Sequence, residues 1–410
     1  MRWLDTFWEY EQNTTMELTD LTLRKTKTGV ESGVSSRYLH GNGVREVYFS
    51  DDPRSLKGIR TDSPTMWADK RSRQMLNLDV VVTFLKEVLA DWQTDGSMQA
   101  IVRQSVQRIV VETEEGTVSD VRPTCFVRMS SDREFYLGSV NYAYHGYLDE
   151  ADPHILRKEI EEYLKRSTMR RHPASLSEAK GWVFGSGAAG FLLHELVGHP
   201  LETDNMVDGR SWVSSCGNRP IGPESLTVID NPCVEGLLGS AHYDDTGRPM
   251  TPGRLILNGR VVGALGDQGP LEEIPLRVYS RARRSSYRDP PHPRMTNVIL
   301  GSGDCSHEML LSELQSGIFI RRILSGEVDS VTGRFAVWVS DADWIENGRL
   351  QYALWPFLLQ GTAGDILGHI SAISDDVTFS SEPLYCSKRG QLVPVAFGSP
   401  SFVVNRGGDD

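Results

Sequence analysis

Long hydrophobic runs are absent from this sequence. No stretch of about 18 apolar residues occurs among the 410 positions, so the sequence predicts no transmembrane helix. Residues 1–15 mix acidic with aromatic side chains, a composition that is not typical of a signal peptide. We therefore expect a cytoplasmic protein that does not contact a membrane.

Cysteine and net positive charge are also scarce. The five cysteines are an odd number in a long chain without an export signal, which favours free thiols or a metal ligand over a disulfide framework. The 43 basic residues are outnumbered by 55 acidic ones, and the net charge is −12. Because tight nucleic-acid binding rests on Lys and Arg, we expect no nucleic-acid partner.

The remaining composition is that of an ordinary globular protein, with 39% hydrophobic and 24% charged residues. Residues 18–51 are expected to form short strands with turns marked by Gly33, Gly41 and Gly43, ending in the run Val44–Phe49, and residues 98–147 a β-meander. Apolar residues at helical spacing predict one amphipathic helix over 78–92 and a second over 155–165.

A domain boundary is expected near residue 178, after a polar stretch that contains Pro173. It divides the chain into an N-terminal mixed α+β domain, residues 1–178, and a C-terminal domain, residues 179–410. The second part contains further expected elements: β-hairpins at the Asn-Gly turns within 255–262 and 345–350, and a helix over 307–318. The predicted fold class is α+β, with a C-terminal domain rich in antiparallel sheet that carries a short helix ending at residue 199.

A glycine-rich turn, Gly185-Ser186-Gly187-Ala188-Ala189-Gly190, follows a strand-like segment and opens this helix. Its G-x-G-x-x-G pattern is the one used by dinucleotide-binding folds. Such a fold also needs a second strand that ends in an acid about 20 residues further on, and the sequence shows none. We therefore expect the small residues to serve close backbone packing rather than to bind NAD or FAD.

The helix carries two histidines and a glutamate, His194, Glu195 and His199, in a mostly apolar setting. Burying such groups is unfavourable unless they are paired or bind a metal. The alternative without a function is a histidine pair at the frayed end of a surface helix. Residues five apart point about 140° away from each other on a regular helix. Both histidines can reach one metal only if the turn over 197–199 widens to an i→i+5 bulge, which Gly198 would ease.

A catalytic zinc site needs a third protein ligand and keeps a position open for water. Cys386, in a polar turn between two extended stretches, is one candidate. Glu202 and Asp204, just beyond the helix, are the others, since some zinc sites complete a histidine pair with a carboxylate. A structural zinc site would instead fill four positions with protein ligands.

At these residues the sequence resembles the TldD/PmbA metallopeptidases. The similarity covers most of the chain and is densest over 181–402. The stretches that resemble the family follow in its order: Gly187-Ala188-Ala189-Gly190-x-Leu192-Leu193-His194-Glu195-x-Val197-Gly198-His199, Leu201-Glu202-x-Asp204, Arg283-Arg284-x-Ser286-Tyr287, Pro293-Arg294-Met295-Thr296-Asn297, Gly326-Glu327-Val328-Asp329 before Thr332-Gly333, and Cys386-x-Lys388-x-Gly390-Gln391-x-Val393-Pro394-Val395 with Gly398-x-Pro400. Residues 111–123 resemble the family more weakly.

The resemblance implies a TldD-type subunit, because PmbA-type (TldE) partners lack the histidines and the glutamate of the H-E-x-x-x-H motif. It implies that His194, His199 and Cys386 bind zinc, the metal that a thiolate with two imidazoles favours. It assigns Glu195 as the general acid/base of a zinc-dependent peptidase that hydrolyses small or unfolded peptides in a closed cavity. It further implies a heterodimer with a PmbA/TldE-like partner. A homodimer with a second copy of the chain is the alternative.

Three features depart from the family. Pro200 and Ser387 stand where it usually has glycines, and the region before residue 50 is shorter than usual. The short region leads to the hypothesis of a specialised role in peptide or natural-product maturation. Two other functions stay open: metal-dependent cleavage of a non-peptidic amide or C–N bond in a biosynthetic pathway, and a scaffold with structural zinc.

A basic loop spans residues 281–294. Such a loop is most often a solvated connection. The alternative is that Arg284, Tyr287 and Arg294 grip a peptide backbone or a terminal carboxylate by bidentate hydrogen bonds.

Overall fold

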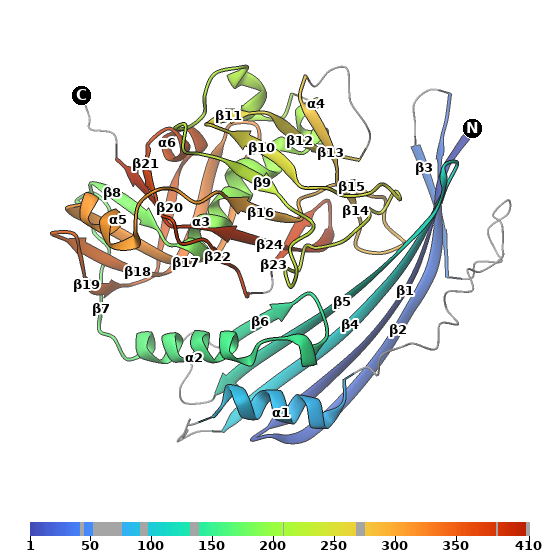
Figure 1. Cartoon of the computed structure of the whole chain (residues 1–410), viewed down its shortest axis with the longest axis horizontal. Helices are drawn as coiled ribbons and strands as arrows, with labels where there is room; N and C mark the ends of the chain where they lie inside the picture. Colours follow the sequence, from blue (N-terminus) through green and yellow to red (C-terminus); the bar gives the residue numbers. More distant parts are fainter. Residues whose placement is uncertain are drawn as a thin grey trace.

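The computed structural model describes residues 1–41, 45–51, 76–90, 97–131, 139–207, 209–267, 275–382 and 384–406. Long curved strands from the first third of the chain form one sheet, and helices α1 and α2 lie near its lower end (Figure 1). The other elements form a second body of shorter strands and helices above it (Figure 1). The fold is of the α+β class, as the sequence predicts.

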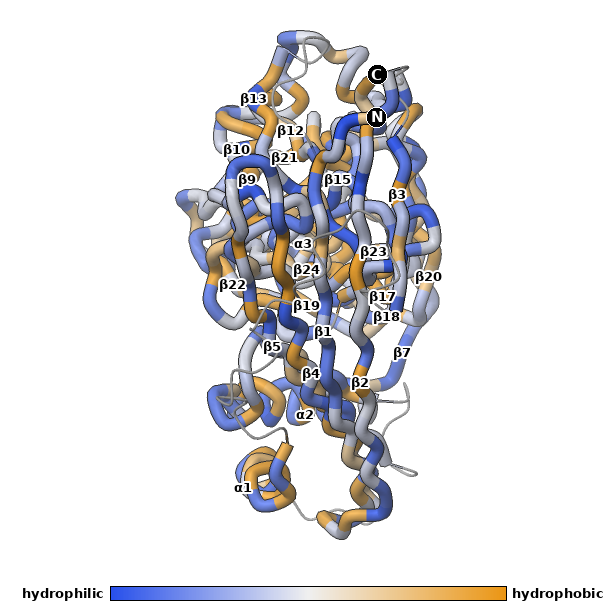
Figure 2. Tube along the Cα trace, turned by 90° about the vertical axis from the view of Figure 1, so that its right-hand side faces the viewer, coloured by the Kyte–Doolittle hydropathy of each residue, from blue (hydrophilic) through white to orange (hydrophobic). Residues whose placement is uncertain are grey.

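The first sheet has six antiparallel strands in the order β3-β2-β1-β4-β5-β6. Their bounds are β1 Arg2–Thr19, β2 Thr22–Leu39, β3 Arg45–Ser50, β4 Met98–Thr113, β5 Gly116–Ser131 and β6 Val140–Tyr144. The meander over 98–147 is thus confirmed. Hydrophilic and hydrophobic residues alternate along the long strands (Figure 2), because successive side chains point to opposite faces.

The expectation of short strands over 18–51 is wrong for most of the segment, because β1 and β2 form a hairpin with 18 residues in each strand, and it is confirmed only at the end, where β3 is a short strand. Gly33, which suggested a turn, lies inside β2. A Cβ atom at this position would come within 2.1 Å of the Tyr287 ring. Glycine here makes room for a side chain of the second body, and the strand continues past it.

Helices α1 (Leu78–Val88) and α2 (Pro153–Ser167) cover one face of this sheet. The Asp152 side chain caps α2 by accepting the N–H of His154 at 2.9 Å, so the predicted second helix is confirmed. Helix α1 ends at Val88 rather than at residue 92, which lies outside the described residues. Within the described ranges, no helix combines the length and the apolar character that a membrane span requires.

Two further sheets enclose helix α3 (Ser186–Leu193), which contacts β16 and β24 of one and β8 and β17 of the other. The first has the order β11-β10-β9-β16-β24-β22, with β23 paired to β24, and the second the order β21-β25-β8-β17-β18-β19-β7, with β20 paired to β18. The strands of the first are β9 Val228–Asp230, β10 Gly253–Leu257, β11 Arg260–Val261, β16 Asn297–Leu300, β22 Thr378–Phe379, β23 Leu384–Lys388 and β24 Gln391–Ser399. Those of the second are β7 Arg171–His172, β8 Gly181–Phe184, β17 Ser316–Val328, β18 Arg334–Glu346, β19 Arg349–Leu354, β20 Phe357–Thr362, β21 Ile370–Ile373 and β25 Phe402–Asn405.

Smaller elements complete the second body. They are the pairs β12 (Gly263–Gly266) with β13 (Arg277–Ser280) and β14 (Ala282–Arg283) with β15 (His292–Pro293), the helices α4 (Thr203–Val207), α5 (His307–Glu313) and α6 (Ala363–Leu367), and 3-10 turns over His199–Leu201 and Trp212–Cys216. A further 3-10 turn, Leu148–Glu150, packs with the first sheet and its helices.

Both predicted Asn-Gly hairpins are confirmed, at Asn258-Gly259 between β10 and β11 and at Asn347-Gly348 between β18 and β19. The helix predicted over 307–318 is partly wrong, because α5 ends at Glu313. Ile318 instead lies in β17, where it pairs with strands on both sides. The apolar run at this point is a buried strand, which periodicity alone does not separate from a buried helix.

The two bodies are joined by buried ion pairs. Arg122 on β5 pairs with Asp245 at 2.8 Å, and Arg166 at the end of α2 pairs with Asp341 and Asp343 of β18 at 2.6 and 2.8 Å. The division at residue 178 stays a prediction. Strand β7, which precedes it, pairs with β19 of the second body.

Gly190→Ala is expected to lower the melting temperature, because a Cβ there would lie 2.3 Å from the Phe397 ring. The loss should amount to about 1–3 kcal/mol of unfolding free energy. Gly187→Ala is the matched control on the same helix. Its Cβ would have no described neighbour nearer than 3.9 Å, so stability should stay equal or rise. Thermal unfolding followed by circular dichroism measures both, and equal losses would contradict close packing at Gly190.

Candidate metal centre

The helix that begins as α3 changes its spacing at the first histidine. After Leu193 it continues as one π-helical turn, His194–Gly198, in which the His199 N–H donates to the carbonyl of His194. This is the i→i+5 widening that the sequence predicts. A Cβ on Gly198 would lie 1.7 Å from the Met295 sulfur, so the turn depends on glycine at this position.

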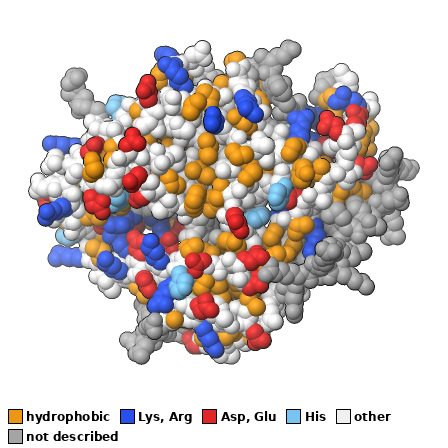
Figure 3. Space-filling model, in the orientation of Figure 1, with side chains coloured by type: hydrophobic (Ala, Val, Ile, Leu, Met, Phe, Trp, Pro, Cys, Tyr) orange, Lys and Arg blue, Asp and Glu red, His pale blue; other side chains and the backbone are white. Residues whose placement is uncertain are grey.

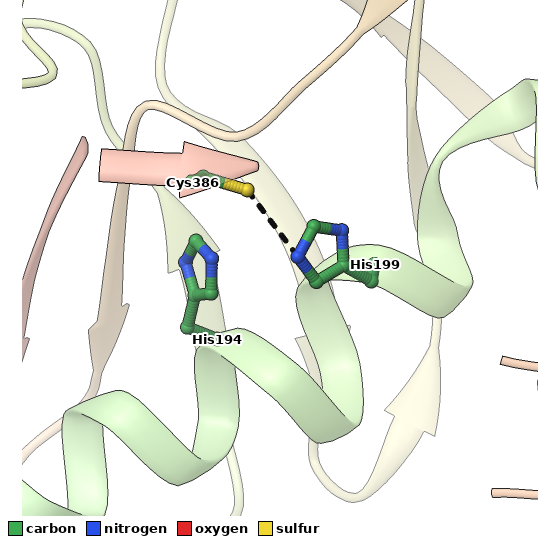
Figure 4. A group of neighbouring side chains, drawn as sticks. All are labelled: His194, His199 and Cys386. Carbon is green, nitrogen blue, oxygen red and sulfur yellow. Dashed lines mark hydrogen bonds between the residues drawn. The ribbon is translucent and has the colours of Figure 1, made fainter. Parts of the chain in front are cut away.

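The widened turn brings both imidazoles to one side of the helix, facing Cys386 on β23 (Figure 4). One candidate ligand atom from each of the three residues lies within 4.8 Å of the other two. The Cys386 Sγ lies 3.3 Å from His199 Nε2, and the two imidazole rings stand nearly perpendicular, with centroids 5.1 Å apart. His194 and Cys386 are buried, whereas the side chain of His199 keeps 15% exposure.

Strand β23 presents Cys386 from a tight hairpin with β24. The hairpin turns at Arg389 and Gly390, both with positive φ. The guanidinium of Arg294, which is fully buried, donates to the carbonyl of Cys386 and, at 3.5 Å, to that of Gln391. Arg294 therefore holds the backbone that carries the thiol.

A buried ion-pair network orients His199 from its other side. Its Nδ1 lies 3.2 Å from Glu202 Oε2, which leaves Nε2 to face Cys386. Lys388 donates to Glu202 at 2.8 Å, to Asp204 at 2.7 Å and to the carbonyl of Pro293 at 3.1 Å. Glu202 and Asp204, the rival third ligands, are thus engaged with Lys388 and His199, and Cys386 is the residue that joins the two imidazoles.

Lys388 was not assigned a role by sequence reasoning, although a signal was present. It stands two residues after Cys386 on the same strand, and residues two apart point to the same face. The Lys388 ammonium reaches the carboxylates of Glu202 and Asp204 because the β23–β24 hairpin packs beside the segment that follows the 3-10 turn. No local sequence pattern predicts this contact.

The cluster is strongly polarised. Burial raises the pKa of the Cys386 thiol, but the rings of His199 and His194 outweigh burial and lower it to about 4. Burial lowers the pKa of His199, yet Glu202 and Cys386 raise it overall. Burial raises the pKa of Glu202, and Lys388 and His199 outweigh this and lower it to about 2. The thiolate and the ionised carboxylate are therefore the favoured forms.

Glu195 lies between the two histidines on the π turn and is nine-tenths buried. Burial raises its pKa, and the histidines oppose the shift only in part. A raised pKa makes the carboxylate a stronger base, which is the direction that a general acid/base needs.

The donor atoms fit a zinc ion. A thiolate and two imidazoles are ligands that Zn²⁺ favours. The roles of His194, His199 and Cys386 as ligands stay a prediction.

The three residues predicted to bind substrate do not join this cluster. Arg284 stacks on the Phe7 ring at 4.2 Å and donates to Ser35 Oγ at 2.8 Å, and Tyr287 is fully buried against the first sheet. Arg294 supports the Cys386 backbone. Their role in substrate binding stays a prediction.

Two cavities lie beside the cluster without being lined by any of its three side chains. One, of about 500 Å³, is lined by residues of α2, β17 and β18. It lies in the region on the left of Figure 3 where basic and acidic side chains gather. The other, of about 610 Å³, lies between the first sheet and the β23–β24 hairpin. All five cysteines are free thiols, which agrees with the absence of a disulfide framework.

The chain is similar to metallopeptidases of known families. The sequence model of the PmbA/TldA metallopeptidase C-terminal domain matches residues 182–407. A metalloprotease TldD homolog from Buchnera aphidicola is 29% identical over 311 residues, which are 72% of this chain and 64% of that protein. A zinc metalloprotease TldD homolog from Saccharolobus solfataricus is 28% identical over 61% of this chain and 54% of its own length. The chain thus matches less than two thirds of the length of these curated relatives.

The fold is similar to that of a solved structure. TldE from Thermococcus kodakarensis superposes with a TM-score of 0.71 over 98% of this chain and 95% of that one, at 15% sequence identity. At this identity the likeness concerns the fold.

Metal analysis by mass spectrometry is expected to find one zinc per chain in the purified wild type. His194→Ala and Cys386→Ala should lose it, because each removes a candidate ligand. Cys216→Ala, a thiol elsewhere in the chain, is the control and should keep the metal. Zinc retained by Cys386→Ala would move the third ligand to Glu202 or Asp204.

Glu202→Gln is expected to weaken zinc binding by about 10- to 100-fold, because the acceptor that orients His199 loses its charge. Competition with a chromogenic chelator measures the affinity. The exposed Glu224→Gln should bind zinc like the wild type, and an unchanged affinity in Glu202→Gln would show that this network does not orient the ligand.

Proposed function

The chain belongs to the PmbA/TldA metallopeptidase family, and on this premise we propose that it is a zinc-dependent peptidase of the TldD type. The observation that carries the proposal is the π turn that faces His194 and His199 toward Cys386, with Glu195 between them. The names of the relatives, metalloproteases and in one case a zinc metalloprotease, support the same class of reaction.

The residues present divide the work of amide hydrolysis among them. Zinc held by His194, His199 and Cys386 would supply Lewis-acid polarisation of the scissile carbonyl. With Zn²⁺ bound, two neutral imidazoles and one thiolate would neutralise only one of its two charges, so the site would keep a net positive charge. Glu195 would accept a proton from the attacking water and pass it to the departing amine nitrogen, a transfer that its raised pKa favours. Glu202 and Lys388 would hold His199 in place.

The alternative of a structural zinc site is less well supported. Such a site usually has four protein ligands, and the groups of candidate ligand residues among the described residues contain only three here. The two nearby carboxylates, Glu202 and Asp204, each bond to Lys388 through one oxygen and do not belong to the group of three. A ligand position left open to water is what a hydrolase needs.

Small or unfolded peptides are the proposed substrates, with a PmbA/TldE-like protein as the proposed partner and a second copy of this chain as the alternative. The likeness of the fold to that of TldE supports a partner of related shape. A role in peptide or natural-product maturation, or cleavage of a non-peptidic amide, would use the same catalytic residues.

Glu195→Gln is expected to keep its zinc and to lose peptide hydrolysis by about 100- to 10,000-fold, because the amide cannot accept the proton. Hydrolysis of a mixture of unfolded peptides is measured by mass spectrometry, with the chain alone and with a co-encoded PmbA/TldE-like protein. The exposed Glu313→Gln is the control and should match the wild type.

Full activity in Glu195→Gln would remove its assigned role. Wild type that binds zinc but hydrolyses no peptide in either combination would favour the non-peptidic amide or the scaffold.

A further inference from the structure

The cavity of about 610 Å³ lies between the strands of the first sheet and the second body. Its volume falls in the range of small-molecule sites. Strands β1, β4 and β5 contribute to one wall, and the residues 283–285 at the end of β14 together with the β23–β24 hairpin contribute to the other. Four arginines and two carboxylates are among its lining residues, so the lining carries an excess of positive charge.

Two of these arginines, Arg283 and Arg284, are buried, and the carboxylates near them, Asp245 among them, offset the effect of burial on their pKa only in part. Their exposures are 7% and 4%, and no ion pair joins either of them to a described carboxylate. The donors that are used bond to neutral acceptors: Arg283 to the carbonyl of Met295 at 2.7 Å, and Arg284 to Ser35 Oγ at 2.8 Å and the carbonyl of Asp245 at 2.9 Å. Arg284 Nε is buried and has no described partner.

The carboxylates nearby are already engaged. Asp245 accepts from Arg122 at 2.8 Å through one oxygen and from the backbone N–H of Arg284 at 2.8 Å through the other. Asp5 is paired with Arg37. Burial consequently lowers the pKa of both Arg283 and Arg284 to about 10. Burying unpaired guanidinium groups is unfavourable, and an anion in the cavity would offset this.

Apolar side chains also line the cavity. Tyr385 and Leu392, on the two strands of the hairpin, line it and are 53% and 55% exposed. Phe126 and Leu238 add further apolar surface. Tyr385 precedes Cys386 on β23, and successive side chains of a strand point to opposite faces. The cavity therefore lies on the other face of the strand from the metal cluster.

We infer that this cavity is a binding site for an apolar carboxylic acid, the carboxylate held by Arg283 and Arg284 and the apolar group by Tyr385 and Leu392. Planar guanidinium groups bind carboxylates through paired hydrogen bonds. A free N-acylated amino acid and the C-terminal residue of a peptide share this chemistry. The site is independent of the proposed catalysis, because none of the candidate zinc ligands lines it.

Isothermal titration of the full chain tests the site with matched probes. N-acetyl-L-phenylalanine is expected to bind at least about 10-fold more tightly than its primary amide, because only the acid supplies the countercharge. Alanyl-alanyl-phenylalanine with a free or an amidated C-terminus forms the second pair. Binding by both acids indicates that peptide ends are accepted, and binding by the short acid alone limits the site to small molecules.

Variants assign the binding to this cavity. Arg284→Gln should abolish the preference for the acid, and Leu392→Asp should weaken the acid by about 10-fold or more, since it adds a negative charge to the wall. The exposed Arg334→Gln is the control and should bind like the wild type. Leu392 is half-exposed, so Leu392→Asp is expected to fold. It therefore tests whether the acid binds in this cavity if Arg284→Gln fails to melt cooperatively.

Two results would overturn the inference. One is equal binding of acid and amide, or binding of neither up to millimolar concentration. The other is a preference for the acid that disappears in chelator-treated protein or in His194→Ala, which would place the carboxylate at the zinc. Because these titrations need no turnover, they stand apart from the test of the proposed peptidase.

Discussion

Two imidazoles five positions apart can face one point only where a helix gives up its regular spacing, and the candidate centre depends on this constraint. The His199 N–H bonds to the carbonyl of His194 instead of to that of Glu195. Gly198 permits the wider turn because the sulfur of Met295 fills the space that a Cβ would need. Since α3 is enclosed between two sheets, the turn cannot relax without repacking that core.

Buried cationic side chains on the two faces of β23 have different partners. On the face of the metal cluster, Lys388 is matched by Glu202 and Asp204, and the network orients a candidate ligand. On the face of the cavity, the guanidinium groups of Arg283 and Arg284 donate to neutral acceptors. A paired charge stabilises local geometry, whereas an unpaired one in a cavity favours a ligand of opposite sign. The same strand thus separates the candidate metal centre from the proposed anion site.

Sequence patterns were informative where a local rule decides the conformation. The helical period required the bulge at His194–His199, and the Asn-Gly turns located both hairpins. Sequence patterns gave wrong predictions where tertiary packing determines the local conformation. Gly33 suggested a turn but lies in a long strand paired on both sides, where the absence of a side chain leaves room for the Tyr287 ring. The apolar residues after Glu313 suggested a longer helix, but strands on both sides draw Ile318 into β17.

The sequence by itself determined the class of fold, the presence of a histidine pair with a glutamate, and the condition under which that pair could share a metal. These features follow from spacing along the chain, which the backbone period converts into direction. Only the tertiary structure decided that Cys386 rather than Glu202 or Asp204 faces the imidazoles, that Lys388 engages those carboxylates, and that Arg284 and Tyr287 lie against the first sheet. Such contacts join residues more than 180 positions apart, and their proximity arises from the packing of sheets that no local pattern encodes.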